Sequence, residues 1–271
     1  MKMLDLRSKI AVVTGGASGI GRGIAEALIE QGARVVIADI EEGPLRKTAD
    51  EIGAAALQVD VTQAESVEAL AREVQTRFGK VDIVCNNAGV GSTGKIADLK
   101  LIDWQWILNV NLFGVLHGVQ SFLPRLKANP DGGQILNTAS VAGLLATMPM
   151  FGAYSVSKFG VVALTEALDH ELKAEGSKVG AGLLLPGPVR SNLNKSQRNR
   201  PTVIGESALI DVDLDDLAGV FGDTVPWINA IDAGRIAVEA IKDGRLYAIT
   251  HPAFYGEIGA RHAAIAVAFG A

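Results

Sequence analysis

The sequence predicts an α/β fold in which helices cover both faces of a doubly wound, parallel β-sheet. Three observations support this fold class. Short β-branched segments alternate with longer helical patterns, the strand segments are nearly continuous apolar runs, and a glycine-rich turn follows the first of them. Continuous apolar runs are typical of strands buried on both faces, and right-handed crossovers make such a sheet parallel. We expect about seven strands in the order 3-2-1-4-5-6-7.

The N-terminal part of the chain alternates strands and helices regularly. Strands are expected at 10–13, 34–38, 55–59 and 81–85. Helices are expected at 19–31, at 43–52, and from Thr62 to about Phe78. Thr62 has the hydroxyl group of a helix cap, and Glu65 three residues later fits the partner position of a capping box.

Two long helical patterns, at 103–128 and 151–175, flank a strand expected at 134–138. A strand at 179–185, a helix at 229–242, a short strand at 245–249 and an apolar tail complete the pattern. The intervening residues 190–228 are polar, glycine-containing and acidic, with no linker that would separate a second domain. We expect one catalytic domain over 1–271, with 190–228 as a substrate-loop insertion at the ligand-binding edge of the sheet.

Composition excludes several classes of function. The 271-residue chain has a formal net charge of −5, so it lacks the basic surface that nucleic acids require. Its four histidines are scattered without metal-ligand spacing, and its one cysteine, Cys85, indicates a reducing compartment. The charged N-terminus precedes an apolar run too short for a signal peptide or a membrane span. We expect a cytoplasmic protein that binds no nucleic acid, no metal and no membrane.

A glycine-rich segment, Gly15-Gly16-Ala17-Ser18-Gly19-Ile20-Gly21, separates the first strand from the first helix. Glycine permits a sharp turn and a close approach of the backbone to a pyrophosphate. The N-terminus of the next helix offers free N–H groups and a favourable dipole. The segment predicts a dinucleotide site, although its spacing differs from G-x-G-x-x-G and glycines in such a turn can be purely structural.

Asp39 ends the second strand, eighteen residues after Gly21. A carboxylate at this position can accept hydrogen bonds from the adenosine ribose, and it repels a 2′-phosphate. Neither Ser18 nor Ile40 supplies the lysine or arginine that would attract such a phosphate. Asp39 therefore predicts NAD as the cofactor and disfavours NADP; the alternative is a solvated aspartate at a strand end.

Tyr154 and Lys158 are four residues apart and fall on one face of the second long helix. A free tyrosine has a pKa near 10, and lowering it to about 7 takes about 4 kcal/mol. A nearby ammonium, together with the positive nicotinamide of NAD⁺, shifts the pKa in that direction and makes the phenol a base. Taken alone, such a pair is more often a surface feature.

With its neighbouring motifs, the chain resembles the short-chain dehydrogenase/reductase family over residues 7 to about 193. The shared motifs are Thr14 to Gly21, Asp60-Val61, Asn86 to Gly89, Val110-Asn111-Leu112, Ser140, Tyr154-x-x-x-Lys158 and Pro186 to Val189. The resemblance implies a single-domain Rossmann-like fold. It also implies an oxidoreductase that transfers a hydride between NAD(H) and a secondary alcohol or ketone.

The resemblance further implies roles for individual residues. Tyr154 would be the general acid/base, Ser140 would position the substrate oxygen, and Lys158 would lower the tyrosine pKa and bind the nicotinamide ribose. Asn111 would hold a water that links Lys158 to solvent. The implied cofactor-binding residues are Gly15, Ser18, Gly19, Ile20, Gly21, Asp39, Asp60, Val61, Asn87, Ala88, Gly89, Tyr154, Lys158, Pro186, Gly187, Val189 and Ser191.

Some of these residues have structural alternatives. Ser140 could cap a turn, and Asp60 could cap a helix. Asparagine is mildly unfavourable inside a helix, which favours a functional reason for Asn111. Ser140 precedes Tyr154 by fourteen residues, one more than the family spacing, so its geometry is the first point to check. Ser191 stands where the family often has threonine, and it retains the hydroxyl group.

Substrate specificity is expected to depend on 91–95, 144–151 and 190–228, whose apolar side chains include Phe151 and Phe221. These segments predict a hydrophobic or aromatic secondary alcohol, or the matching ketone. The two long helices are apolar on more than one face, and the resemblance implies a homodimer or homotetramer joined there. Two alternatives remain open: an NADP-dependent carbonyl reductase of biosynthesis, and a catalytically silent NAD(H)-binding regulator.

Overall fold

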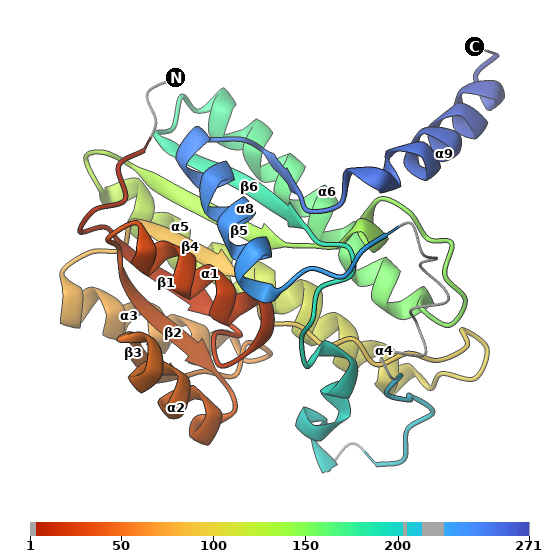
Figure 1. Cartoon of the computed structure of the whole chain (residues 1–271), viewed down its shortest axis with the longest axis horizontal. Helices are drawn as coiled ribbons and strands as arrows, with labels where there is room; N and C mark the ends of the chain where they lie inside the picture. The colour runs from red at the N-terminus through yellow and green to blue at the C-terminus, as the bar shows by residue number, and fades with distance from the viewer. Residues whose placement is uncertain (1–3, 203–204, 213–224, 271) are drawn as a thin grey trace.

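The computed structural model describes residues 4–202, 205–212 and 225–270. Its seven-stranded sheet has the order β3-β2-β1-β4-β5-β6-β7, and neighbouring strands are parallel (Figure 1). The predicted fold class and strand order are confirmed. The strands are β1 (Ile10–Thr14), β2 (Arg34–Asp39), β3 (Ala55–Gln58), β4 (Ile83–Asn86), β5 (Gly133–Thr138), β6 (Val179–Leu185) and β7 (Tyr247–Ile249).

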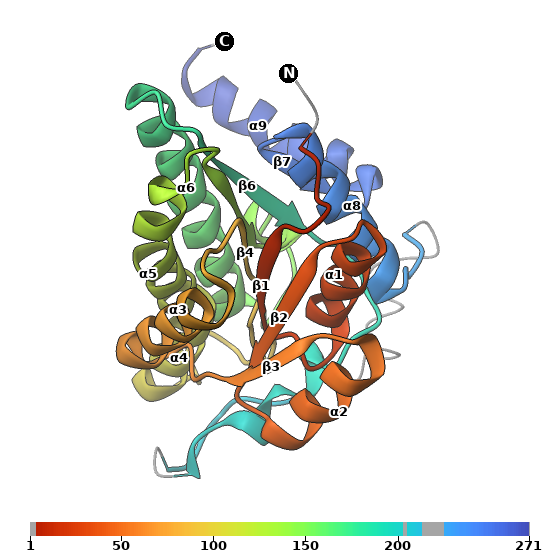
Figure 2. The same ribbon diagram turned by 90° about the vertical axis from the view of Figure 1, so that its left-hand side faces the viewer.

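Helices cover both faces of this sheet (Figure 2). One face carries α1 (Gly19–Glu30), α2 (Glu42–Ile52) and α8 (Ala230–Asp243). The other carries α3 (Ala64–Phe78), α5 (Gly114–Ala128) and α6 (Gly152–Ala174). Along β1, Ala11 and Val13 pack into the first layer, whereas Ile10 and Val12 pack into the second. Both faces of the strand are thus buried, which explains its continuous apolar run.

The long helix expected at 103–128 is interrupted. It consists of α4 (Leu101–Leu108), a π-helical turn (Asn109–Phe113) and α5. In the turn, the N–H of Gly114 bonds to the carbonyl of Asn109, five residues earlier. Such turns are common at functional sites, and this one contains Asn111.

The combined helical stretch Leu101–Ala128 is long and apolar enough, by length and composition alone, to cross a membrane. Half of its most apolar window is nevertheless buried. In particular, Phe122 and Leu126 of α5 lie in the core between α3 and the sheet. Core helices that cover a sheet share this composition.

The apolar tail forms a helix, α9 (Tyr255–Ala268), that projects away from the body of the molecule (Figure 1). None of its residues is buried. Ile258 packs at its start against Val141, Leu145 and Phe254.

The predicted cap of α3 is wrong. The residue before this helix is Gln63, and Thr62 makes no capping bond. The hydroxyl of Thr62 instead donates a 2.7 Å hydrogen bond to the carboxylate of Asp60, which also accepts the backbone N–H of Thr62. The Thr62 hydroxyl thus bonds to the nearby carboxylate of Asp60 and does not cap α3.

Candidate active site

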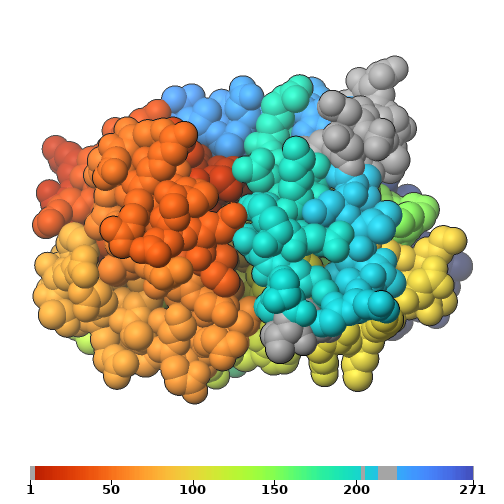
Figure 3. Space-filling model, turned by 90° about the horizontal axis from the view of Figure 1, so that it is seen from below, coloured from red at the N-terminus to blue at the C-terminus, as the bar shows by residue number. Residues whose placement is uncertain are grey.

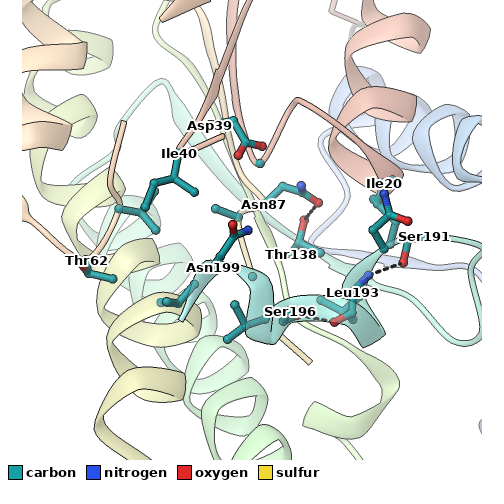
Figure 4. Close-up of a pocket in the computed structure, with 18 of the residues that line it drawn as sticks. Ile20, Asp39, Ile40, Thr62, Asn87, Thr138, Ser191, Leu193, Ser196 and Asn199 are labelled. Atoms are coloured by element: carbon teal, nitrogen blue, oxygen red, sulfur yellow. Dashed lines mark hydrogen bonds between the residues drawn. The ribbon is translucent and has the colours of Figure 1, made fainter. Parts of the chain in front are cut away.

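A cavity of about 560 Å³ lies at the C-terminal ends of the central strands, the edge where ligands of doubly wound sheets bind. Its walls come from the β1–α1 turn, the ends of β2, β4 and β5, helices α4 and α6, and the insertion after β6. Figure 3 shows this insertion, in teal and cyan, beside the orange segment near residue 50. The close-up in Figure 4 shows Asp39, at the end of β2, and Asn199, in the insertion, facing the same space.

The glycine-rich turn leads into the N-terminus of α1. Gly19 has a φ of 53°, in the left-handed region, and a Cβ there would lie 2.9 Å from the Cβ of Ser191. A Cβ on Gly21 would meet the carbonyl oxygen of Gly15 at 2.0 Å. The side chain of Ser18 makes no capping bond, so the first turn of α1 keeps N–H groups for another acceptor. The turn therefore fits the pyrophosphate of a dinucleotide.

Asp39 lies beside the glycine-rich turn. Its carboxylate accepts 3.1 Å hydrogen bonds from the backbone N–H groups of Ala17 and Glu41. Burial raises the pKa of Asp39, and these backbone hydrogen bonds oppose the rise. A carboxylate has lone pairs beyond those two bonds, so Asp39 can also accept hydrogen bonds from ribose hydroxyls.

A threonine hydroxyl organises the segment after β4. Thr14 Oγ1 accepts hydrogen bonds of 3.0 and 3.1 Å from the N–H groups of Asn87 and Ala88. The amide oxygen of Asn87 accepts a 3.2 Å bond from the hydroxyl of Thr138 (Figure 4). These bonds join the ends of β1, β4 and β5 along one wall of the cavity.

Ser140 follows β5 and faces the first turn of α6. Its hydroxyl donates to the carbonyl of Pro186 at 3.3 Å and accepts the N–H of Ala142 at 3.1 Å, so it does cap a short 3₁₀ turn. It also lies near enough to the Tyr154 phenol to oppose the rise of the tyrosine pKa. The extra residue in the sequence spacing therefore does not separate the two hydroxyl groups.

Tyr154 and Lys158 are both buried, and burial shifts both pKa values against the charged forms. Burial raises the pKa of Tyr154 to about 12, opposed by the hydrogen bond with Ser140. Burial lowers the pKa of Lys158 to about 8. In the protein by itself the tyrosine pKa is thus raised, because desolvation of the phenolate is the largest effect; the lowered pKa expected from the sequence included the charge of bound NAD⁺ and stays a prediction.

The ammonium group of Lys158 is held next to the tyrosine. Nζ donates a 3.0 Å hydrogen bond to the carbonyl of Thr138 and lies 5.7 Å from the centroid of the Tyr154 ring. The i, i+4 spacing on α6 thus brings the two side chains together as predicted.

Asn111 is fully buried in the π-helical turn. Its amide oxygen accepts a 2.8 Å bond from the N–H of Val90, and its amide nitrogen donates at 3.0 Å to the Val90 carbonyl and to the Ser157 hydroxyl. A Cβ on Gly89 would lie 3.3 Å from Asn111 Oδ1 and 3.7 Å from Lys158 Nζ. Asn111 therefore ties α4 and α5 to α6, close to the lysine.

The structure brings the predicted site residues together around one cavity. All of the predicted catalytic and cofactor-binding residues line it except Gly21 and Asn111, which are buried behind its wall. Gly21 permits the tight approach of the first helical turn to Gly15, so its contribution is to the shape of the turn.

One wall of the cavity was not predicted from the sequence, and two predicted segments lie outside its lining. Residues of α4 and the π-helical turn line it, whereas the expected segments 91–95 and 144–151 do not. From 144–151, Leu145 packs against Val141 and Phe254 instead. Part of the insertion, 203–204 and 213–224 with Phe221, lies outside the described residues. The lining residues not predicted include Val90, Ile102, Gln105, Trp106, Asn109 and Val110.

A metal centre was not expected from the sequence. Among the residues that the structure describes, no group of three or more His, Cys, Asp or Glu side chains is placed to hold a metal ion.

Known proteins with the same architecture are similar over nearly the whole chain. A crystal structure of a short-chain dehydrogenase/reductase from Burkholderia phymatum in complex with NAD superposes with a TM-score of 0.90 at 37% identity, covering 98% of this chain and 96% of that one. The LigO apo form from Sphingobium sp. strain SYK-6 has a TM-score of 0.79 at 30% identity, covering 98% and 91%.

Sequence comparison gives the same relationship. The CLA biosynthesis dehydrogenase/reductase of Lactiplantibacillus plantarum is 32% identical over 263 residues, which cover 93% of this chain and 91% of that protein. The family profile of the short chain dehydrogenases matches residues 9–202. The chain therefore belongs to the short-chain dehydrogenase/reductase family of oxidoreductases, which bind a nicotinamide cofactor.

Proposed function

We propose that this protein transfers a hydride between NAD(H) and a hydrophobic or aromatic secondary alcohol or ketone. One observation carries the proposal: Ser140, Tyr154 and Lys158 share a cavity with the glycine-rich turn and Asp39. A bound nicotinamide would accept or supply the hydride. The chain's own residues must then orient the substrate and move one proton at its oxygen.

Tyr154 is the proton-transfer group in this proposal. With a pKa of about 12 the phenol is protonated at neutral pH, so it can protonate the oxygen of a ketone that is being reduced. In the opposite direction the phenolate accepts the alcohol proton, and the nearby charge of Lys158 stabilises it. Ser140 would turn its hydroxyl from the Pro186 carbonyl to donate a hydrogen bond to the substrate oxygen beside the phenol. Asn111 holds a water that connects Lys158 to solvent.

The cofactor preference rests on Asp39. Its fixed carboxylate accepts hydrogen bonds from an unmodified ribose and repels a 2′-phosphate, so we assign NAD rather than NADP. The similar Burkholderia phymatum structure, which is an NAD complex, supports this assignment.

The substrate class rests on the apolar wall that extends beyond the proposed catalytic residues. Its apolar side chains are Val90, Ile102, Trp106, Val110 and Leu193. Such a wall favours a hydrophobic or aromatic group attached to the reacting carbon. The relative from Sphingobium sp. named C alpha-dehydrogenase, 29% identical over 92% of this chain, is consistent with a dehydrogenase reaction.

We further propose a cytoplasmic homodimer or homotetramer joined through α5 and α6. Its partners would be small-molecule substrates, without nucleic acid or membrane. The net charge of −5 supports the exclusion of nucleic acid.

The test is to titrate NADH and NADPH by fluorescence and then screen secondary alcohols for NADH absorbance. We expect tighter binding of NADH and turnover that Tyr154→Phe abolishes. Tighter binding of NADPH would contradict the role of Asp39 and favour the biosynthetic carbonyl reductase. NADH binding without turnover of any alcohol or ketone, in wild type and Tyr154→Phe alike, would favour the regulator.

A further inference from the structure

Arg198 is the cation nearest to Asp39 in the wall of the cavity. In the described part of the chain, Lys158 and Arg198 are the two cationic side chains that line this wall. Lys158 is held beside Tyr154 by its bond to Thr138, at the end where the proposed chemistry occurs. Arg198 is therefore the lining cation that a phosphate carried near Asp39 would have to bind.

The guanidinium group of Arg198 is already occupied. It lies in a 3₁₀ helix of the insertion (Leu193–Asn199) and binds Glu41 in a bidentate manner, with Nε–Oε1 at 3.0 Å and Nη2–Oε2 at 2.7 Å. Its Nη1 donates to the carbonyls of Asn192 and Lys195 at 3.1 and 2.6 Å. A phosphate could bind this guanidinium through two parallel hydrogen bonds only after the paired carboxylate had moved away.

Glu41 is also coupled to Asp39. Its backbone N–H donates to Asp39 Oδ1, so the same turn fixes both carboxylates. The hydrogen bond with Glu41 raises the pKa of Arg198 most, and the charge of Asp39 adds to the rise. Asp39, Glu41 and Arg198 thus form one group with two negative charges and one positive charge.

We propose that Glu41 masks Arg198 and so acts with Asp39 to exclude dinucleotides that carry a 2′-phosphate. This inference rests on the proposed preference for NAD(H). Asp39 repels the phosphate directly, whereas Glu41 keeps the one suitable cation from binding it. Glu41 and Arg198 are thereby specificity-determining residues, contributed by segments 157 positions apart.

The masking role makes opposite predictions for the two partners of the ion pair. Removing the negative charge with Glu41→Gln frees Arg198 for a phosphate, and we expect the Kd for NADPH to fall about three- to tenfold. The Kd for NADH should change less than about twofold, because no phosphate occupies that position. Arg198→Gln and the double variant Glu41→Gln/Arg198→Gln should show no improvement for NADPH.

The experiment is a fluorescence titration of NADH and NADPH against wild type and these three variants, with thermal melting to verify folding. Glu41→Ala provides a second way to free Arg198 and should give the same direction of change. Arg235→Gln is the matched control, because Arg235 pairs with Glu30 in a similar bidentate manner at 3.1 and 2.8 Å, outside the cavity walls. This control should leave the ratio of the two Kd values unchanged.

The outcomes separate this inference from the proposed function. A wild type that prefers NADH, with an unchanged Kd ratio in Glu41→Gln and Glu41→Ala, would refute the masking role alone. If Glu41→Gln and Arg198→Gln weaken the binding of NADH and NADPH equally, the ion pair only stabilises the shape of the cavity, and the masking role is again refuted. A wild type that binds neither dinucleotide, or that prefers NADPH, would overturn the proposed NAD(H) preference and the masking role with it.

Discussion

The Lys158 ammonium lies 5.7 Å from the centroid of the Tyr154 ring, in a site where burial opposes charge on either side chain. Burial raises the pKa of Tyr154 to about 12 and lowers that of Lys158 to about 8. At neutral pH the pair is therefore a neutral phenol beside an ammonium that loses its proton more readily than that of an ordinary lysine. Two predictions concern this pair, one concerns the contact between α1 and α8, and one concerns the thiol in β4.

Tyr154→Phe should remove proton transfer and leave cofactor binding intact. The substitution deletes only the hydroxyl, so we expect kcat to fall about 10²- to 10⁴-fold, the usual range for loss of a general acid or base. The Kd for NADH should change less than about twofold. Steady-state kinetics and NADH titration measure both. A kcat near the wild-type value would exclude Tyr154 as the acid/base.

Lys158→Met should change how stability depends on pH. The folded-state pKa of Lys158 is lowered to about 8, so between pH 8 and 10.5 the unfolded chain binds more protons at this residue than the folded protein does. The free energy of unfolding contributed by this lysine therefore rises with pH across that window. Relative to Lys158→Met, wild type should gain about 2–3 kcal/mol between pH 7.5 and 10.

Urea unfolding of wild type and Lys158→Met at a series of pH values measures this difference. Tyr154 and Cys85 have raised pKa values, so they change the free energy of unfolding with pH in the opposite direction to Lys158. Both residues are present in both proteins, so their contributions cancel in the comparison. Parallel pH curves for the two proteins would contradict the lowered pKa of the lysine.

Gly23→Ala should destabilise the contact between α1 and α8. A Cβ on Gly23 would lie 2.1 Å from the carbonyl oxygen of Ala230, and a Cβ on Gly234 would lie 2.1 Å from that of Gly23. The helices would have to separate, at a cost of about 3 kcal/mol in the free energy of unfolding. Gly43→Ala is the control, because nothing lies within 4 Å of a Cβ there and alanine favours helix. Denaturant unfolding should show a lower free energy of unfolding for Gly23→Ala and no decrease for Gly43→Ala.

Cys85 should be unreactive in the native protein. It lies in β4 with no exposed surface, and burial raises the pKa of its thiol to about 12, so the reactive thiolate is scarce. A thiol reagent such as 5,5′-dithiobis(2-nitrobenzoate) should label it only after unfolding in guanidinium. Rapid stoichiometric labelling of the folded protein would contradict the burial of β4.

The regular elements could be predicted because their causes are local. The apolar run at 10–13 and the helical period at 19–31 match β1 and α1 to within a residue at each end. Asp39 and the glycine-rich turn could be placed at the sheet edge for the same reason: parallel strands end together there.

Other features depend on contacts between distant parts of the chain, and no local pattern indicates them. The π-helical turn contains Asn111, whose side chain bonds to the backbone of Val90, and that contact exists only once the turn has packed against the segment that follows β4. The helical period at 103–128 is continuous across it. The pairing of Glu41 with Arg198 likewise joins two segments that the fold brings together. The raised pKa of Tyr154 in the protein by itself could not be predicted, because burial depends on the packed structure.

The strand order has a consequence for how the protein is made. β1 is paired on one side with β2 but on the other with β4, and β4 needs β5, so a growing chain that stops before residue 83 has an open edge at β1. The two ends of the cavity, on α1 and α6, are separated by the 121 residues between Glu30 and Gly152. A small molecule that fills the cavity can therefore act only on chains that already contain α6 and the insertion after β6. It would protect the finished protein by mass action without guiding the earlier steps of its folding.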